Sequence, residues 1–141
     1  LASMKAYRKN NPEYFREYEN KRYREDPSYR MECTLRRRLC EKVAKAKTGK
    51  VGTTFELLGC SIAEFMRYME SLFQPGMTWE NHSFEGWHID HIKPCAAFNL
   101  TKPEHQKECF HYTNLQPLWK NDNFKKGDNY TETMLPQDTN G

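Results

Sequence analysis

The sequence has few apolar residues and no long apolar run. Hydrophobic residues make up 37% of its 141 residues, and the mean hydropathy is −1.01. No segment approaches the roughly 20 consecutive apolar residues that a membrane-spanning helix needs, and no secretory signal peptide is visible. These features predict one small core with part of the chain extended. They also predict an intracellular, cytoplasmic protein (in the host cell if the source is viral) with no membrane partner.

Paired cysteine motifs are also missing. The five cysteines are Cys33, Cys40, Cys60, Cys95 and Cys109. An odd number without any C-x-x-C argues against a disulfide framework and against a tetrahedral zinc site. Reduced thiols, as in the cytosol, are the expectation. A mixed site that uses Cys95, Cys109 and His111 stays open as an alternative.

Acidic charge is scarce in the first third of the chain. Residues 1–50 hold 15 Lys and Arg against 7 Asp and Glu, a net charge of +8, whereas residues 51–141 carry −5. Such an asymmetry predicts a basic helical arm over residues 1–50 that contacts nucleic acid. A helix surface that is only solvated would show the same charge pattern, and this alternative stays open. The expected contacts are Arg36, Arg37, Arg38 and Lys42.

Helix signals fill the chain up to residue 86. Asn11-Pro12 and Asp26-Pro27 are typical N-caps followed by Pro, and they predict helices at about 12–24 and 27–47, the second one stopped by Gly49. An apolar stripe with a spacing of four marks the core side of the second helix: Met31, Leu35, Leu39 and Val43. Capping boxes at 53–56 and 61–64 predict two further helices, the first ended by Gly59. Residues 51–86 are therefore expected to be a helical support.

The polar residues suited to chemistry lie between Trp87 and Asp128. This segment begins W-H-I-D-H-I-K-P and ends Y-T-N-L-Q-P-L-W-K-N-D-N-F-K-K-G-D, with a connection of 17 residues between the two halves. The pattern predicts strands at 87–92, closed by Pro94, and at 112–116, closed by Pro117. Asp122 is expected to cap a helix that starts near Asn123.

The residue types in this segment suit metal-assisted phosphodiester hydrolysis. The oxygens of Asp90 and Asn123 are ligands for a Mg²⁺ that keeps several of its waters. His91 can take a proton from water near neutral pH. Lys125 and Lys126 add positive charge where a phosphodiester would sit.

Strand geometry constrains this set, because adjacent residues in a regular strand point to opposite faces. Asp90 and His91 can serve one phosphate only if the strand ends or bulges near His91. Otherwise His88 and Asp90, which are two residues apart, would share a face and make the ligand pair.

The order D-H-I-x-P, then N-L-Q-P-L-x-x-x-x-N-x-x-K-G-D, resembles the HNH (ββα-metal) endonucleases, especially the small ones of phages and mobile elements. The resemblance implies an α+β fold in which a two-stranded antiparallel hairpin plus a helix, over residues 87–130, is supported by an N-terminal helical layer. It implies Asp90 and Asn123 as metal ligands and His91 as the general base. Asn114 would tie the loop between the strands, and His88 is expected as an auxiliary residue that orients the site.

One departure from the family changes the expected cofactors. Many HNH proteins have Cys at the positions of Trp119 and Asp122, which is half of a structural zinc site. We therefore expect no structural zinc, a helix held by the packing of Trp119, and Mg²⁺, Mn²⁺ or another divalent cation in the site. The expected partner is DNA, most simply double-stranded, bound by a monomer or homodimer. The alternative function is a DNA-binding or structural module with a vestigial site. Residues 131–141 are expected to form a loose tail.

Overall fold

The structure is a computed structural model that describes residues 2–129, so the expected tail lies outside the described residues. Helices make up most of this part of the chain, and two short strands form its sheet. In chain order the elements are α1 (Ala2–Asn10), α2 (Pro12–Glu25), α3 (Pro27–Lys45), α4 (Thr54–Leu58), α5 (Ile62–Ser71), β1 (Trp87–His91), η1 (Cys95–Ala97), α6 (Pro103–Phe110), η2 (Tyr112–Asn114), β2 (Leu115–Trp119) and α7 (Lys120–Lys126).

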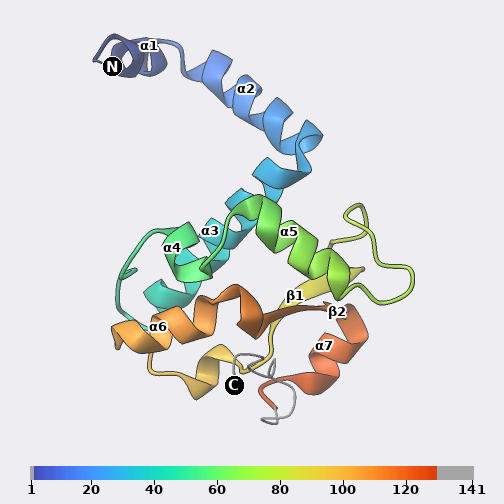
Figure 1. Cartoon of the computed structure of the whole chain (residues 1–141). Helices are drawn as coiled ribbons and strands as arrows, with labels where there is room; N and C mark the ends of the chain where they lie inside the picture. The colour runs from blue at the N-terminus through green and yellow to red at the C-terminus, as the bar shows by residue number, and fades with distance from the viewer. Residues whose placement is uncertain (1, 130–141) are drawn as a thin grey trace.

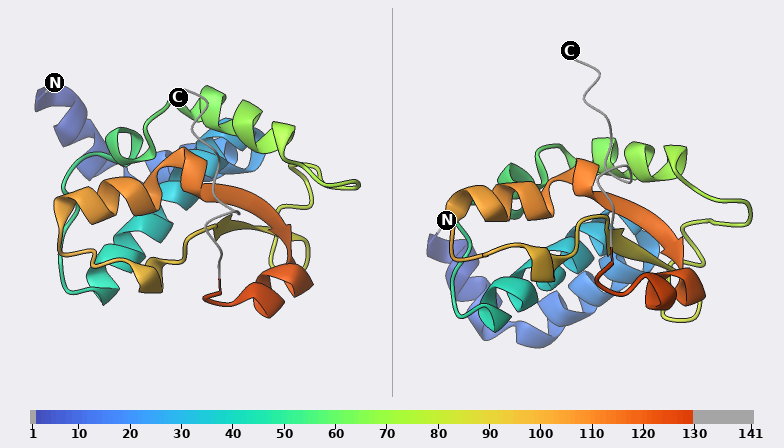
Figure 2. Two further views of the ribbon diagram at one scale, coloured as in Figure 1. Left: turned by 60° about the horizontal axis from the view of Figure 1, so that its bottom comes forward. Right: turned by 90° about the horizontal axis from the view of Figure 1, so that it is seen from below.

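The two strands form an antiparallel hairpin at the centre of a small α+β body. β1 pairs with β2 in a register that sets Trp87 opposite Trp119 and His91 opposite Leu115. Helix α5 covers one face of the hairpin and α7 lies on the other, whereas α1 and α2 extend away from the body (Figures 1 and 2). The predicted α+β class is confirmed.

The main hydrophobic core lies between α3, α5 and the apolar face of the hairpin. Its fully buried side chains include Phe65 and Met69 of α5 and Trp87 of β1. Two residues of the predicted stripe, Met31 and Leu35, join this cluster. The other two, Leu39 and Val43, pack in a second cluster against α4, α6 and the connection. All four are buried, so the core side of α3 was predicted correctly.

Of the two N-caps predicted from the Asx-Pro pairs, only the one at Asp26 forms with its side chain. The carboxylate of Asp26 accepts hydrogen bonds from the backbone N–H groups of Ser28 and Tyr29, at 3.0 and 3.3 Å, and so caps α3 as predicted. Asn11 does not cap α2, because its amide nitrogen instead donates to the carbonyl oxygen of Tyr7 in α1. Helix α1 itself was not predicted.

Both N-caps predicted from the capping boxes and the glycine stop after α4 are confirmed, although Glu56 and Glu64 accept from the cap hydroxyls and not from the cap backbone N–H groups that a full capping box uses. The hydroxyls of Thr53 and Ser61 accept from the backbone N–H three residues on, each at 3.1 Å. Gly59 ends α4 in the left-handed conformation. The end of α3 was predicted wrongly: Lys47, at φ 59°, takes the left-handed conformation two residues before Gly49.

The second strand begins later than predicted and contains Pro117. Hydrogen bonds from Lys120 N to Gly86 O and from Ile92 N to Asn114 O fix the alternation of the ladder. In this register Pro117, opposite Ile89, occupies a position whose backbone nitrogen points to the free edge of the strand. Proline is tolerated there because no ladder hydrogen bond is lost.

The last helix also starts earlier than predicted. It begins at Lys120 directly after β2, with Trp119 in the cap position and no side-chain cap. Asp122 lies in the first turn, where its charge favours the helix without capping it. Trp119 packs against the main core, as expected for the anchor of this helix.

Among residues 2–129 no helix has both the length and the apolar character that crossing a membrane requires.

Gly59→Ala should destabilise the fold. Gly59 has φ +81°, and an added Cβ would lie 2.6 Å from Nε2 of His111. The left-handed conformation alone costs Ala about 1–2 kcal/mol, and the contact adds to that. Gly49→Ala is the matched control, since its Cβ would meet nothing within 4 Å. Chemical denaturation should show a lower midpoint for Gly59→Ala alone. Equal midpoints for the two variants would mean that the left-handed conformation and close contact of Gly59 do not matter for stability.

Candidate functional site

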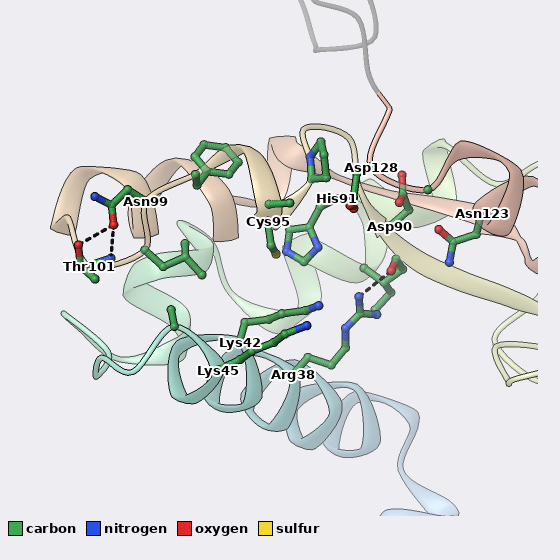
Figure 3. A pocket seen from close by; sticks show the side chains of 17 residues that line it. Arg38, Lys42, Lys45, Asp90, His91, Cys95, Asn99, Thr101, Asn123 and Asp128 are labelled. Atoms are coloured by element: carbon green, nitrogen blue, oxygen red, sulfur yellow. Dashed lines mark hydrogen bonds between the residues drawn. The ribbon is translucent and has the colours of Figure 1, made fainter.

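A cavity of about 540 Å³ lies along the free edge of β1. Its walls come from α3, from β1, from the connection at 94–101 and from residues around α7, and Figure 3 shows the side chains that line it. The predicted site residues Asp90, His91 and Asn123 all reach it. Three elements that are far apart in the sequence therefore meet at one strand edge.

Asp90 is a buried carboxylate, 7% exposed, on the face of β1 that packs against α7. Its Oδ2 accepts from Nε2 of Gln116 on the neighbouring strand at 2.9 Å. The ammonium of Lys126 lies 3.2 Å from the same oxygen and also donates to the carbonyl oxygen of His91 at 2.8 Å. Lys126 thus supplies the positive charge that this carboxylate needs.

The orientation of Asn123 follows from its contact with His88. Nε2 of His88 lies 2.8 Å from the carbonyl oxygen of Phe84, so this ring nitrogen carries the proton and donates. In the neutral ring Nδ1 is then an acceptor, and the amide nitrogen of Asn123 donates to it at 3.0 Å. The amide oxygen of Asn123 is turned away from His88 and is available on the cavity side. His88 therefore orients Asn123.

His91 lies on the opposite face of β1 from Asp90. β1 ends at His91, as one expectation allowed, but it is paired regularly as far as that residue and has no bulge, so its end does not bring Asp90 and His91 to one face. Both side chains nevertheless line the cavity, because it follows the strand edge and opens to both faces. The alternative pair of His88 with Asp90 does not form through His88, whose two nitrogens contact Phe84 and Asn123.

One face of α3 forms a basic wall of the cavity, made by Arg38, Lys42 and Lys45. These positions are four and three residues apart, which places them on one side of a helix. Arg38 donates to the carbonyl oxygen of Ile89 at 2.8 Å, and burial lowers the pKa of its guanidinium. In Figure 3 the ammonium groups of both lysines point into the cavity near His91.

The predicted basic residues thus divide into two groups. Arg38 and Lys42 line the cavity, but Arg36 and Arg37 do not, and they pair with Glu32 and Glu41 along the exposed side of the helix, at 2.9 and 3.8 Å. Lys45 completes the wall and was missed as a site residue, although its spacing from Arg38 could have identified it.

The two lysines after Asn123 also differ from each other. Lys125 is exposed. Lys126 is turned inward to Asp90, with a side chain only 9% exposed, so it does not point at solvent as a phosphate contact would. A second acid, Asp128, lines the cavity and was not singled out in the sequence.

Asn114 holds the two ends of the connection together. Its Oδ1 accepts from Lys93 N at 2.8 Å, and its amide nitrogen donates to the carbonyl oxygens of Lys93 and Cys109, at 3.1 and 2.9 Å. The side chain is 5% exposed. This is the structural task that the resemblance implies for it, because these bonds fix the turn that follows His91.

Two cysteines lie beside His91. The thiol of Cys109 is 3.5 Å from the sulfur of Cys95. Hydrogen bonds from Cys109 and then from His91 lower the pKa of the Cys95 thiol to about 4, against the opposing effect of burial. The mixed site left open in the sequence had His111 as its third member, but Nδ1 of His111 contacts the hydroxyl of Thr113, and His91 lies beside the two cysteines instead.

Comparisons with known proteins found relatives in a virus. Uncharacterized protein L246 of Acanthamoeba polyphaga mimivirus is 41% identical over 107 residues, 76% of this chain and 46% of that protein. Uncharacterized protein L426 of the same virus is 38% identical over 124 residues, 88% of this chain and 53% of that protein. The chain spans about half the length of these curated relatives. No family model and no solved structure matches it.

Lys126→Gln should destabilise the protein by on the order of 3 kcal/mol, because it leaves the buried charge of Asp90 without its partner. Lys125→Gln removes the same charge from an exposed neighbour and should change stability by less than about 0.5 kcal/mol. Urea denaturation of the three proteins in EDTA measures the difference. Equal losses for the two variants would mean that the Asp90–Lys126 pair does not support the fold.

Proposed function

We propose that this protein is a divalent-metal-dependent DNA endonuclease of the HNH type, hydrolysing phosphodiester bonds at the free edge of β1. One observation carries the proposal: a single cavity brings Asp90, His91 and Asn123 under the basic wall of α3. The motif residues that resemble the HNH family and the charge needed for a polyanion therefore converge on one place. The α+β hairpin followed by a helix agrees with this family.

The donor set fits a hard divalent cation such as Mg²⁺ or Mn²⁺. Asp90 offers a carboxylate, and the orientation set by His88 leaves the amide oxygen of Asn123 available. Oxygen ligands of this kind are those that Mg²⁺ prefers, and two of them leave positions for water and phosphate oxygens. The ammonium of Lys126 lies 3.2 Å from Oδ2 and 3.4 Å from Oδ1 of Asp90, so a bound cation would share this carboxylate with Lys126.

A bound cation of this class stabilises the negative charge that develops on the phosphate and on the departing 3′ oxygen. The residues of the chain do the rest. His91 takes a proton from the attacking water. Its ring lines the same cavity as the basic wall, where the phosphate would bind. Lys42 and Lys45 attract the negatively charged phosphodiester and keep it beside His91. Asn114 fixes the turn that follows His91.

The arm formed by α1 and α2 favours an extended partner such as double-stranded DNA. Helix α2 has no buried residue, and several of its aromatic side chains are exposed, among them Tyr14 and Tyr18. Helix α2 has four basic and four acidic residues, whereas α1 has three basic residues and no acidic one, so α1 is the part of the arm whose charge suits the backbone of a duplex beyond the cleavage site. One hairpin-and-helix unit acts on one strand, so cutting both strands requires a homodimer or two successive events.

The second candidate is a DNA-binding or structural module with a vestigial site. A vestigial site needs neither the ligands nor the base, whereas here all three lie in one cavity and Asp90 and Asn123 keep their hydrogen bonds to Gln116 and His88. The enzyme is therefore the favoured function.

Cleavage of supercoiled plasmid tests the proposal. The wild type should cut with Mg²⁺ or Mn²⁺ and not in EDTA. His91→Ala should cut about 10²–10⁴-fold more slowly while DNA binding survives, because only the general base is lost. His105→Gln is the control, since His105 lies outside the cavity lining. Full activity in EDTA, or an unaffected His91→Ala enzyme, would refute the mechanism.

The metal ligands give a separate arm of that experiment. Asp90→Ala and Asn123→Ala should each abolish metal-dependent cleavage, and the double variant should be little worse than either, because residues that act as one unit are not additive. Asn121→Ala, on the exposed side of the same helix, should cut normally. If Asn121→Ala were inactive and Asn123→Ala active, the assignment on α7 would be wrong.

The basic wall predicts a specific salt dependence of DNA binding. Lys42→Gln/Lys45→Gln should make the slope of log K against log[salt] shallower by about 2, since each neutralised phosphate contributes about 0.9. Arg36→Gln/Arg37→Gln removes the same charge from the same helix but outside the cavity, and should leave the slope nearly unchanged. Binding measured at several salt concentrations decides, and equal effects of the two double variants would contradict a local wall.

A further inference from the structure

His91, Cys95 and Cys109 form a compact cluster of nitrogen and sulfur donors outside the proposed Mg²⁺ ligands. One donor atom from each residue lies within 4.8 Å of the others. The two sulfurs are 3.5 Å apart. Nothing in the proposed hydrolysis requires either cysteine, so the cluster needs an explanation of its own.

The fold brings the three residues together from three different elements. His91 ends β1, Cys95 begins the short helix η1, and Cys109 lies in the last turn of α6. Asn114 bonds to the backbone at Lys93 and at Cys109, and so holds the turn after β1 against the end of α6. The cluster is thus set by a buried hydrogen-bond network and not by mobile surface side chains.

We propose that His91, Cys95 and Cys109 bind a thiophilic divalent cation of the zinc class, with its fourth position open to the cavity. With bonds of about 2.3 Å to sulfur and about 2.0 Å to nitrogen, a tetrahedral ion needs sulfurs about 3.8 Å apart and a nitrogen about 3.5 Å from each. The sulfurs, at 3.5 Å, are about 0.3 Å closer than this arrangement needs, and the limit of 4.8 Å on the spacing of all three donor atoms exceeds the nitrogen–sulfur spacing by at most about 1.3 Å. His91 and Cys95 line the cavity and Cys109 lies fully buried behind them, so the open position faces the cavity.

The chemistry of the donors separates this site from the proposed Mg²⁺ site. Thiolates and imidazole select zinc-class ions, whereas carboxylate and amide oxygens select Mg²⁺. The sequence argued against a tetrahedral zinc site because it has no C-x-x-C and because Trp119 and Asp122 replace the cysteines of the family. The proposed site departs from that expectation, since it uses cysteines far apart in the sequence that the fold brings beside His91. A site with three protein ligands and one open position is also not the closed four-ligand type that structural zinc uses.

Binding here would switch off the proposed nuclease, a consequence that rests on the proposed function. A cation on the imidazole occupies the lone pair that His91 needs in order to accept a proton from water. A zinc-class ion should therefore inhibit Mg²⁺-supported cleavage by capturing the general base. The metal site itself does not depend on the activity and can be tested without it.

The binding experiment uses the whole reduced protein and Co²⁺ as the spectroscopic probe. A phosphine reductant and a thiol count keep Cys95 and Cys109 from forming a disulfide, which would remove both ligands. The wild type should bind one Co²⁺ with thiolate charge-transfer absorption and tetrahedral ligand-field bands, and Zn²⁺ should displace it. Cys95→Ser should weaken binding by at least about 100-fold, since even residues that only support a ligand contribute about 10–100-fold.

Matched variants make the result decisive. Cys40→Ser changes an exposed cysteine of α3 and should bind like the wild type. Cys109→Ser tests the buried ligand, and if it does not fold, half-buried Cys95 and cavity-lining His91 still test the site. His91→Gln should keep the thiolate absorption but bind more weakly. A wild-type spectrum without thiolate bands, or one that survives Cys95→Ser, would overturn the proposal.

The activity arm separates the two proposals. Within each protein, the ratio of cleavage with and without micromolar Zn²⁺ at constant Mg²⁺ is compared. Strong inhibition of the wild type and of Cys40→Ser, with relief in Cys95→Ser, supports capture of His91. Thiolate–Co²⁺ binding without any Mg²⁺-dependent cleavage would leave the metal site standing and remove the nuclease. Cleavage that Zn²⁺ inhibits equally in Cys95→Ser would mean that zinc acts elsewhere, and would overturn the capture of His91.

Discussion

The free edge of β1 is the constraint on which the site depends. A two-stranded sheet leaves one edge of each strand without a second strand. At that edge of β1, Asn81 and His82 bond to Trp87, and beyond this point the carbonyl groups of Ile89 and His91 point outward. Unpaired carbonyls near the interior must find donors. Arg38 of α3 supplies one and Lys126 of α7 the other, at 2.8 Å each. Two long cations therefore draw two helices to one strand edge, and the cavity is the space that remains between them.

This arrangement explains how a regular strand can present adjacent residues to one cavity. Asp90 and His91 point to opposite faces, as strand geometry demands. A binding site on a sheet face could use only one of them, but a site along the edge is open to both. Arg38 and Lys126 thus have a second effect: by satisfying the edge they also exclude another strand, which would otherwise pair there and fill the cavity.

The sequence predicted what depends on local periodicity and capping, and it failed where register or tertiary contact decides. The stripe on α3, the cap by Asp26 and the stop at Gly59 are local, and all three are confirmed. The prediction that Pro117 ends the second strand was wrong, because proline is tolerated in a strand when its nitrogen faces the free edge, and only the pairing register determines that. The prediction that Lys126 contacts phosphate failed for a related reason. A shift of one position along the helix determines whether a lysine points to solvent, as Lys125 does, or to a buried carboxylate. The sequence identified Cys95 and Cys109 as possible ligands of one site. It did not identify His91, which only the fold places beside them.

His91 is the residue at which the two halves of the site meet. Oxygen donors approach it from the α7 side and sulfur donors from the α6 side, and the basic wall of α3 lies across the cavity. A base for hydrolysis must keep an accessible lone pair, and the same lone pair is what a soft cation seeks. For the base of the proposed nuclease, two neighbouring thiols are a liability unless capture of His91 by a cation is useful or the cation is kept away. Packing in the second cluster accounts for the place of Cys109, whereas half-buried Cys95 opens to the cavity, so its chemistry is the stronger reason for its place next to His91.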